Sequence, residues 1–439
     1  MATTTAIPTA LPTAPVKQNR GKDQIPWSDG VWKALDHAVM EEMMRTRVAA
    51  KFLPHVRVDR KQTNVAADVV ISPALLALAA QQQPPADSAL FIDESLTKRV
   101  QEYWVTFRMS VAQVEEEEHQ EAGMNAQMMA GYSQAQQPAM MGQHAGHMSY
   151  PQRASTAVSL TLRTANILAQ GEDLILFNGQ NAVANAPLFL TQQVQALDPN
   201  LKTDLDLGLL NIQPLPAGSP GIPAGQAANV ITLPPSQVIP VHPVPPTAGT
   251  PSFPPVYREN TLNAVADAFS ALQGLGHYEN YALVLHTFPY ADLHQARPTT
   301  LIDPVEPVSH LIKAGIYGTG TLPPFTQVTQ AGPQPPSSGL PTLIQTSQPG
   351  QLLTTSPLAT APILGPLIGT ANVLYTGVLV SLSGNTMDHV RGCMDNQLDV
   401  MVTFNQKDAN EQYRFRVVER FALRLKDPSA VILLLFVDS

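Results

Sequence analysis

The sequence has 439 residues, of which 44% are apolar and only 14% are Asp, Glu, Lys or Arg, and it contains 40 prolines. A chain this apolar is not one whose disorder is driven by charge. Because obligate interfaces between subunits are depleted in Lys, Glu and Asp, the low charge predicts that the protein associates with other copies of itself. The net charge of −9 argues against a nucleic-acid-binding protein with a broad basic face.

Cysteine content and apolar run length restrict the setting of the protein. Cys393 is the only cysteine, so the chain can form neither an internal disulfide nor a cysteine-based zinc site, and a reducing, cytoplasmic setting is expected. The first residues have no apolar core behind a positive start, which argues against a secretory signal. The longest apolar stretches, 71–80 and 431–437, are too short to cross a bilayer, so no membrane association is expected.

Three helices are predicted after a flexible arm rich in Thr, Ala and Pro. The first extends from Ser28 to about Ala50. Its apolar positions recur at helical spacing, namely Trp32, Leu35, Val39 and Met43. The second helix is predicted over 153–176, before the stop signal Phe177-Asn178-Gly179, and the third over 261–275.

Strands are predicted around and after these helices. Residues 103–114 alternate apolar and polar side chains, as a half-buried strand does. Later runs typical of strands are 281–286, 373–382, 398–404, 413–426 and 431–436. Two proline-rich stretches, 213–255 and 323–370, argue against helices and central strands. Because helices and strands follow no repeating βαβ order, the sequence predicts an α+β fold.

Four segments together resemble the encapsulins, bacterial and archaeal shell proteins with the HK97 phage-capsid fold. WKALDHAVMEEMMRTRVAAKFLPHV is similar to the family's opening helix, although Ala50 stands where family members often carry an arginine. ILAQGEDLILFNG is similar to the end of the spine helix, with its acidic pair Glu172 and Asp173. YENYALVLHTFPYADL resembles the central strand that follows a helix, and RFRVVERFALRLKDPSAVILLLF resembles the C-terminal strands.

The resemblance implies an HK97 major-capsid-like protomer with an N-terminal arm, an E-loop, a spine helix with a P-domain, and an A-domain. The parts it implies are the arm at 1–27, the N-terminal P-domain helix at 28–55, the E-loop region at 56–118, a Met/Gln/His-rich insertion at 119–150, the spine helix at 151–178, the A-domain at 179–390 and C-terminal P-domain strands at 391–439. Insertions at about 119–150, 187–256 and 323–370 depart from compact family members. Deleting 124–148 or 323–370 is expected to leave assembly possible, because long surface loops cost little to vary.

The resemblance also implies a function. Encapsulins are homo-oligomeric icosahedral shells of sixty copies, or a multiple, that package a cargo protein in the cytoplasm and are not themselves enzymes. Their N-terminal helix and C-terminal strands line a groove that captures a short targeting peptide of the cargo. The candidate cargo-binding residues here are Leu35, Val39, Met43, Ile432 and Leu434. Ordinary packing of the first helix on the protomer's own sheet is the alternative interpretation of its apolar stripe.

Two other functions remain open. A phage or prophage major capsid protein would share the fold, but such proteins commonly carry a long scaffolding segment, and here only about 25 residues precede the first helix. The other is a metal-binding or redox enzyme that uses the loop at 119–150. Thioether and imidazole ligands suit copper(I), and this loop contains Met124, Met128, Met129, Met140, Met141, Met148, His119, His144 and His147.

Other chemical motifs are weak. Glu116 and His119 have the spacing of one half of a di-iron site, but no second Glu-x-x-His pair exists. Glu306 and His310 form an equally isolated pair, and the glycines of 315–320 are expected in a turn. The sequence contains no phosphate-binding loop, nucleophile elbow or HExxH motif. We therefore expect no catalytic residue, metal or cofactor in the shell protein.

Overall fold

The structure is a computed structural model of the whole chain, of which part is described. The described residues are 21, 24–25, 27–71, 91–93, 96–117, 156–179, 194–196, 208–210, 212–215, 228–231, 237–244, 255–295, 305–322, 328–330, 344–348, 351–354, 373–394, 398–408 and 411–438. Within these ranges, no helix is both long enough and apolar enough to cross a membrane. The described fold is α+β, which confirms the predicted class.

The first sheet is built on the long strand β19 (Gln412–Leu425). Its strand order is β1 (His55–Val58), β17 (Met387–Gly392), β19, β6 (Gln101–Ser110) and β7 (Val194–Ala196), and β18 (Val400–Lys407) also pairs with β19. β1 lies parallel to β17, whereas the pairs of β19 with β6, β17 and β18 are antiparallel.

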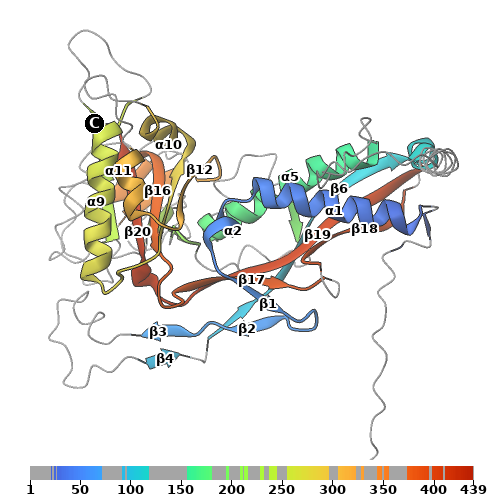
Figure 1. Cartoon of the computed structure of the whole chain (residues 1–439), viewed down its shortest axis with the longest axis horizontal. Helices are drawn as coiled ribbons and strands as arrows, with labels where there is room; N and C mark the ends of the chain where they lie inside the picture. Colours follow the sequence, from blue (N-terminus) through green and yellow to red (C-terminus); the bar gives the residue numbers. More distant parts are fainter. Residues whose placement is uncertain are drawn as a thin grey trace, which may run out of the picture.

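The helices α1 (Asp29–Thr46) and α5 (Thr156–Asn178) lie along the first sheet (Figure 1). The side chain of Ser28 accepts hydrogen bonds from the first turn of α1 and so fixes where the helix begins. α1 packs against α5 and β18, and α5 packs against β6 and β19. Alternate residues of the strands enter the core under the helices, because side chains on a strand point to opposite faces in turn. The resulting core includes Trp32, Leu35, Val39, Met43, Val105, Phe107, Met109, Phe415 and Val417.

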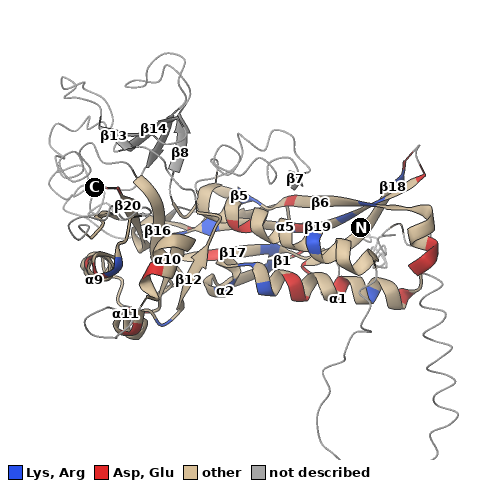
Figure 2. Cartoon of the chain, turned by 90° about the horizontal axis from the view of Figure 1, so that it is seen from above, with Lys and Arg blue, Asp and Glu red and all other residues tan. Residues whose placement is uncertain are grey.

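A second sheet forms the other end of the molecule (Figure 1). Its strand order is β10 (Val238–Val241), β20 (Val431–Val437), β16 (Val373–Ser381), β11 (Tyr281–His286) and β12 (Gly315–Thr319). The helices α9 (Arg258–Gly274), α10 (Thr287–Leu293) and α11 (Val305–Leu311) accompany it. In Figure 2 β16 and β20 are tan because they contain no Lys, Arg, Asp or Glu, whereas charged residues occur along α1.

A third sheet joins two of the proline-rich stretches. Its strand order is β13 (Val328–Gln330), β15 (Gln351–Thr354), β14 (Ile344–Gln348), β9 (Ala228–Ile231) and β8 (Ile212–Leu215). The link between the stretches is the antiparallel pair of β14 with β9. The segments 187–256 and 323–370, which the sequence presented as separate insertions, are therefore structurally joined.

A two-stranded ribbon lies outside these sheets (Figure 1). It consists of the antiparallel pairs β2 (Asn64–Ala66) with β5 (Thr97–Arg99) and β3 (Val69–Ile71) with β4 (Phe91–Asp93). Its base is tied to the body: Arg424 Nη1 donates to Asp68 at 2.8 Å, and the backbone N–H of Val70 donates to the carbonyl of Lys426 at 2.8 Å. The ribbon lies within the region predicted as an E-loop.

Most of the predicted helices and strands are present, with four corrections. The proline-rich stretches 213–255 and 323–370, which were predicted to hold no central strand, contribute β9, β14 and β15, and each of these lies between two other strands of the third sheet. The predicted strand over 103–114 ends at Ser110, and residues 111–117 are helical. The glycines predicted in a turn belong to or follow the strand β12, which pairs in parallel with β11. The predicted C-terminal P-domain strands are divided, because β19 is in the first sheet and β20 is in the second.

Candidate functional site

A buried charged cluster lies at the break between the helices α1 and α2 (Ala49–Phe52). At the break, Arg47 has an extended backbone, and its N–H donates to the carbonyl of Met43. The Arg47 side chain is only 4% exposed. A buried guanidinium is stable only when it is paired, so its partners define the site.

The partners of Arg47 come from α5 and β19. Its guanidinium forms ion pairs with Glu172 on α5 and Glu419 on β19. Two side chains of β17 complete the cluster: His389 Nε2 lies 3.0 Å from Glu172 Oε1, and Arg391 lies 3.8 Å from the same oxygen. Glu172, Glu419 and His389 are all buried. One set of buried ionisable side chains therefore connects the N-terminal helix, the long helix and the sheet.

Asp173 holds the start of α2. Its two carboxylate oxygens accept hydrogen bonds from the backbone N–H groups of Val48 at 2.8 Å and Ala49 at 2.9 Å. The first N–H groups of a helix have no partner within the helix, so this carboxylate supplies one from α5. The acidic pair Glu172 and Asp173, which the resemblance singled out, thus contacts both sides of the break.

The titratable residues of the cluster have pKa values that differ widely from one another. Burial would raise the pKa of Glu172, but the charges of Arg47 and His389 lower it to about 2. Burial and the charge of Glu172 raise the pKa of Asp173 to about 7 and that of Glu419 to about 8, against the opposing effect of Arg47. Burial lowers the pKa of His389 to about 4, although Glu172 acts in the opposite direction.

The cluster is suited to holding the protomer together rather than to chemistry. Perturbed pKa values often mark catalytic sites, but structural ion pairs perturb them too. Catalysis needs a surface that a substrate can reach, and the side chains of Arg47, Glu172 and His389 are at most 4% exposed. Removing one partner of such a buried pair typically costs about 3–5 kcal/mol, because the other charge stays buried and uncompensated.

The five predicted cargo-binding residues do not come together. Leu35, Val39 and Met43 are buried in the core between α1 and the first sheet. Ile432 and Leu434 belong to a different core, which packs against α9, because alternate residues of β20 point to opposite faces. The arrangement is the ordinary packing that the sequence left as the alternative, and in the described chain these residues do not line one shared groove.

The predicted metal candidates remain scattered or outside the described residues. The Met/His-rich stretch at 119–150 lies outside them, as does His119, the partner proposed for Glu116. Glu306 and His310 share α11 as a single pair. Over the described ranges, no three His, Cys, Asp or Glu side chains are grouped as metal ligands would be.

Sequence reasoning missed Arg47 and His389 as members of the cluster. The resemblance placed the family's arginine at position 50, which is Ala, whereas Arg47 lies three residues earlier at the helix break. A basic residue followed by Val-Ala-Ala is unremarkable locally. Its partner Glu419 is 372 residues away, so only the fold reveals the pair.

Comparisons with known proteins find similarity in structure but not in sequence. No protein-family model and no curated protein sequence matches the chain. Among solved structures, a virus-like particle from Pyrococcus furiosus is 11% identical, with a TM-score of 0.45, over 92% of this chain and 99% of that chain. The capsid of an empty GTA particle is 13% identical, with a TM-score of 0.38, over 89% and 96% of the two chains. A holo-SrpI encapsulin complex from Synechococcus elongatus is 10% identical, with a TM-score of 0.34, over 89% and 88%.

Proposed function

We propose that this chain is a structural shell protein that self-assembles into a closed icosahedral nanocompartment of the encapsulin type in the cytoplasm. The shell would package a cargo protein through a short targeting peptide. The proposal combines the resemblance of four sequence segments with the shape of the protomer. It assigns the chemistry of the compartment to the cargo and none to the shell.

The observation that carries the proposal is the exposed ribbon. Ile92 on β4 is 57% exposed and Leu96, just before β5, is 50% exposed. The pair β2 with β5 is anchored by Val65, which is buried with Val58, Val100 and Val390. The outer strands β3 and β4 have only three residues each, and a two-stranded ribbon is only marginally stable in water. Covering Ile92 and Leu96 with a neighbouring copy would remove apolar surface from water and support the ribbon. A projecting element of this kind suits repeated contacts between identical subunits.

The buried cluster supports the same proposal. A closed shell needs every protomer to present its contact surfaces at the same angles, because small deviations accumulate around each symmetry axis. Arg47, Glu172 and Glu419 fix α1, α5 and β19 to one another at the centre of the protomer. The low charge of the chain also agrees with large subunit interfaces.

The proposal is tested by purifying the recombinant protein and measuring its mass and shape by light scattering and electron microscopy. We expect closed hollow particles of megadalton mass. The variant Ile92→Asp/Leu96→Asp should stop or reduce assembly, whereas the control Ile92→Val/Leu96→Val should assemble normally, because it keeps the positions apolar. A wild-type monomer or dimer at physiological salt would contradict the shell proposal. Normal assembly of the Asp variant would show that the ribbon residues Ile92 and Leu96 are not needed for assembly.

The contents of native particles distinguish a compartment from a virus capsid. Particles isolated from the host should contain one abundant protein besides the shell and should have the ultraviolet absorbance of protein. Densely packed nucleic acid would instead favour a phage or prophage major capsid protein. Mass spectrometry and nuclease-protected nucleic acid, measured on the same particles, separate the two outcomes.

A further inference from the structure

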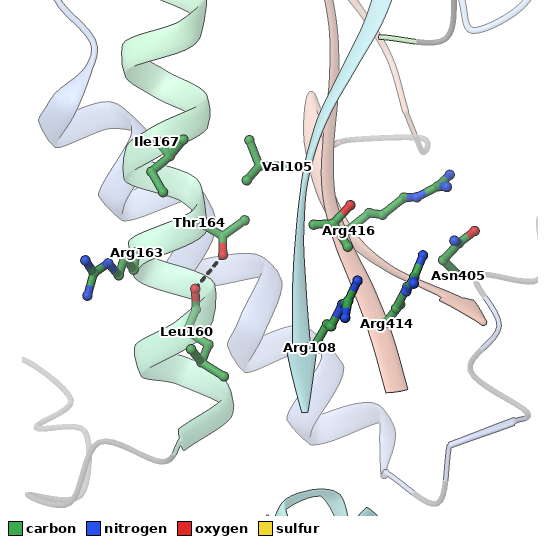
Figure 3. Close-up of a pocket in the computed structure, with 10 residues that line it drawn as sticks. Val105, Arg108, Leu160, Arg163, Thr164, Ile167, Asn405, Arg414 and Arg416 are labelled. Atoms are coloured by element: carbon green, nitrogen blue, oxygen red, sulfur yellow. Dashed lines mark hydrogen bonds between the residues drawn. The ribbon is translucent and has the colours of Figure 1, made fainter. Parts of the chain in front are cut away.

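Three arginines gather on one face of the first sheet. Arg414 and Arg416 alternate with the buried residue Phe415 on β19, so both point away from the core. Arg108 on β6 lies directly opposite Arg414 in the antiparallel register. Figure 3 shows the three side chains extending to the same side of the two strands, with Asn405 of β18 beyond them. We call Arg108, Arg414 and Arg416 the arginine face.

The arginine face borders a cavity of about 360 Å³. The ten described residues that line the cavity include four arginines and no acidic residue. The fourth, Arg163 on α5, points away from the strands in Figure 3. The remaining polar lining is formed by Thr106, Thr164 and Asn405. The lining therefore offers hydrogen-bond donors and positive charge to an anionic group.

The charges of the arginine face are only partly balanced within the described chain. Like charges placed directly opposite each other on neighbouring strands destabilise a sheet, and Arg108 and Arg414 are such a pair. Asp408 serves both: its Oδ2 lies 2.6 Å from Arg414 Nε and 4.0 Å from Arg108 Nε. Arg416 stacks on the ring of Trp104, and its buried Nε donates no hydrogen bond to the described residues. Burial lowers the pKa of Arg416; the charge of Glu102 opposes this shift, and the charge of Arg414 adds to it.

We propose that the arginine face binds a carboxylate-rich extended segment of a partner polypeptide. Arg414 and Arg416 are two residues apart on one strand, which separates them by about 6.7 Å. Alternate side chains of an extended peptide have the same spacing, so two successive outward carboxylates can meet two guanidinium groups. Guanidinium groups bind carboxylates through two parallel hydrogen bonds, which gives the pairing direction as well as strength. The inference does not depend on shell assembly.

The test is direct binding of a fluorescent peptide of alternating Glu and Thr, about ten residues long, measured by anisotropy on the assembled or unassembled purified protein. Because the whole chain has a net charge of −9, non-specific attraction of this peptide is disfavoured. We expect saturable binding that weakens as the salt concentration rises. A peptide of alternating Gln and Thr should not bind, and an oligothymidylate of similar length should bind more weakly than the Glu peptide.

Variants locate the site. Arg414→Gln/Arg416→Gln should weaken binding of the Glu peptide at least tenfold, and Arg414→Lys/Arg416→Lys should give a smaller loss, because charge is kept and the paired hydrogen bonds are not. The matched control is Arg57→Gln, because Arg57 is 58% exposed and lies outside the cavity lining, and it should bind as the wild type does. If the double Gln variant does not fold, Arg108→Gln alone is the test, because this side chain is 55% exposed. Undiminished binding by a folded Gln variant, no binding by the wild type, or tighter binding of the oligothymidylate would overturn the proposal.

Discussion

The carboxylate of Glu117 accepts a hydrogen bond of 3.0 Å from the backbone N–H of Ala157, which is 40 residues later in the chain. Ala157 is the second residue of α5, where backbone N–H groups lack partners within the helix. The buried Glu117 side chain therefore caps the long helix and sits at its positive end. It also joins the two ends of the Met/Gln/His-rich insertion, on either side of residues 119–150.

We expect Glu117→Ala to lower the free energy of unfolding by about 1–2 kcal/mol, because it removes both the capping acceptor and a favourable charge at the helix start. Urea denaturation at constant pH measures this loss. Glu115→Ala on the same short helix is the matched control, since Glu115 is exposed. Equal stability of the two variants would show that the cap contributes nothing measurable.

The same cap gives an expectation for the insertion it spans. Deleting 124–148 and joining the ends with a short flexible linker keeps both Glu117 and Ala157, and loop length changes stability only slowly. The free energy of unfolding of the variant should lie within about 1 kcal/mol of that of the wild type, and the variant should still assemble if the wild type does. Loss of soluble protein on this deletion would show that the segment contributes contacts beyond those of a connecting loop.

The shared third sheet changes the expectation for the other insertions. Sequence alone predicted that 323–370 could be removed by itself. Because β9 pairs with β14 in that segment, the deletion would leave an unpaired strand edge, which promotes aggregation. We expect soluble yield to fall for this deletion and to recover when 212–231 is also replaced by a linker. Sedimentation of the two lysates measures the difference, and equal yields would contradict the role assigned to the sheet.

Periodicity predicted the elements whose burial is local in sequence. The helix α9 and the strand β11 were found because their apolar residues repeat at 3.6 or run continuously. β17 was missed because its Asp388, His389 and Arg391 look polar, yet Asp388 and His389 are buried beside charged partners from other elements. The charged cluster was invisible for the same reason: its members are distant in sequence, and their types alone do not show that they are buried together.

Substitutions at a buried and at an exposed residue of α1 distinguish a core role of this helix from a role in cargo loading. Val39 and Met43 are buried, whereas the adjacent Met44 is 68% exposed. We expect Val39→Asp to prevent folding, because an unpaired carboxylate would be placed in the apolar core. Met44→Asp should fold and assemble, and comparing its particles with wild-type particles for cargo content tests whether the exposed side of α1 contacts the cargo. Normal folding of Val39→Asp would contradict the packing described for the helix.

Glu419 makes stability depend on pH in a definite direction. Its carboxyl has a pKa of about 8 in the folded protein, raised from an ordinary 4.5 chiefly by burial. Between these values the folded state holds a proton that the unfolded state has released, so this group's contribution to stability falls as the pH rises from about 4.5 to 8. Asp173, with a pKa of about 7, acts in the same direction, whereas His389, whose pKa is lowered to about 4, acts oppositely and only below about pH 6.5.

The variant Glu419→Gln isolates this effect, because glutamine resembles the protonated acid and does not titrate. At pH 5 we expect the variant to be close to the wild type in its urea midpoint. As the pH rises to 9 the wild type should lose stability relative to the variant, since only its Glu419 must become a buried charge beside Glu172. The control is Glu411→Gln, because Glu411 is an exposed residue between β18 and β19, and this variant should give no such trend. If Glu419→Gln is instead destabilised equally at pH 5 and pH 9, Glu419 is already ionised at pH 5 and its pKa is not raised.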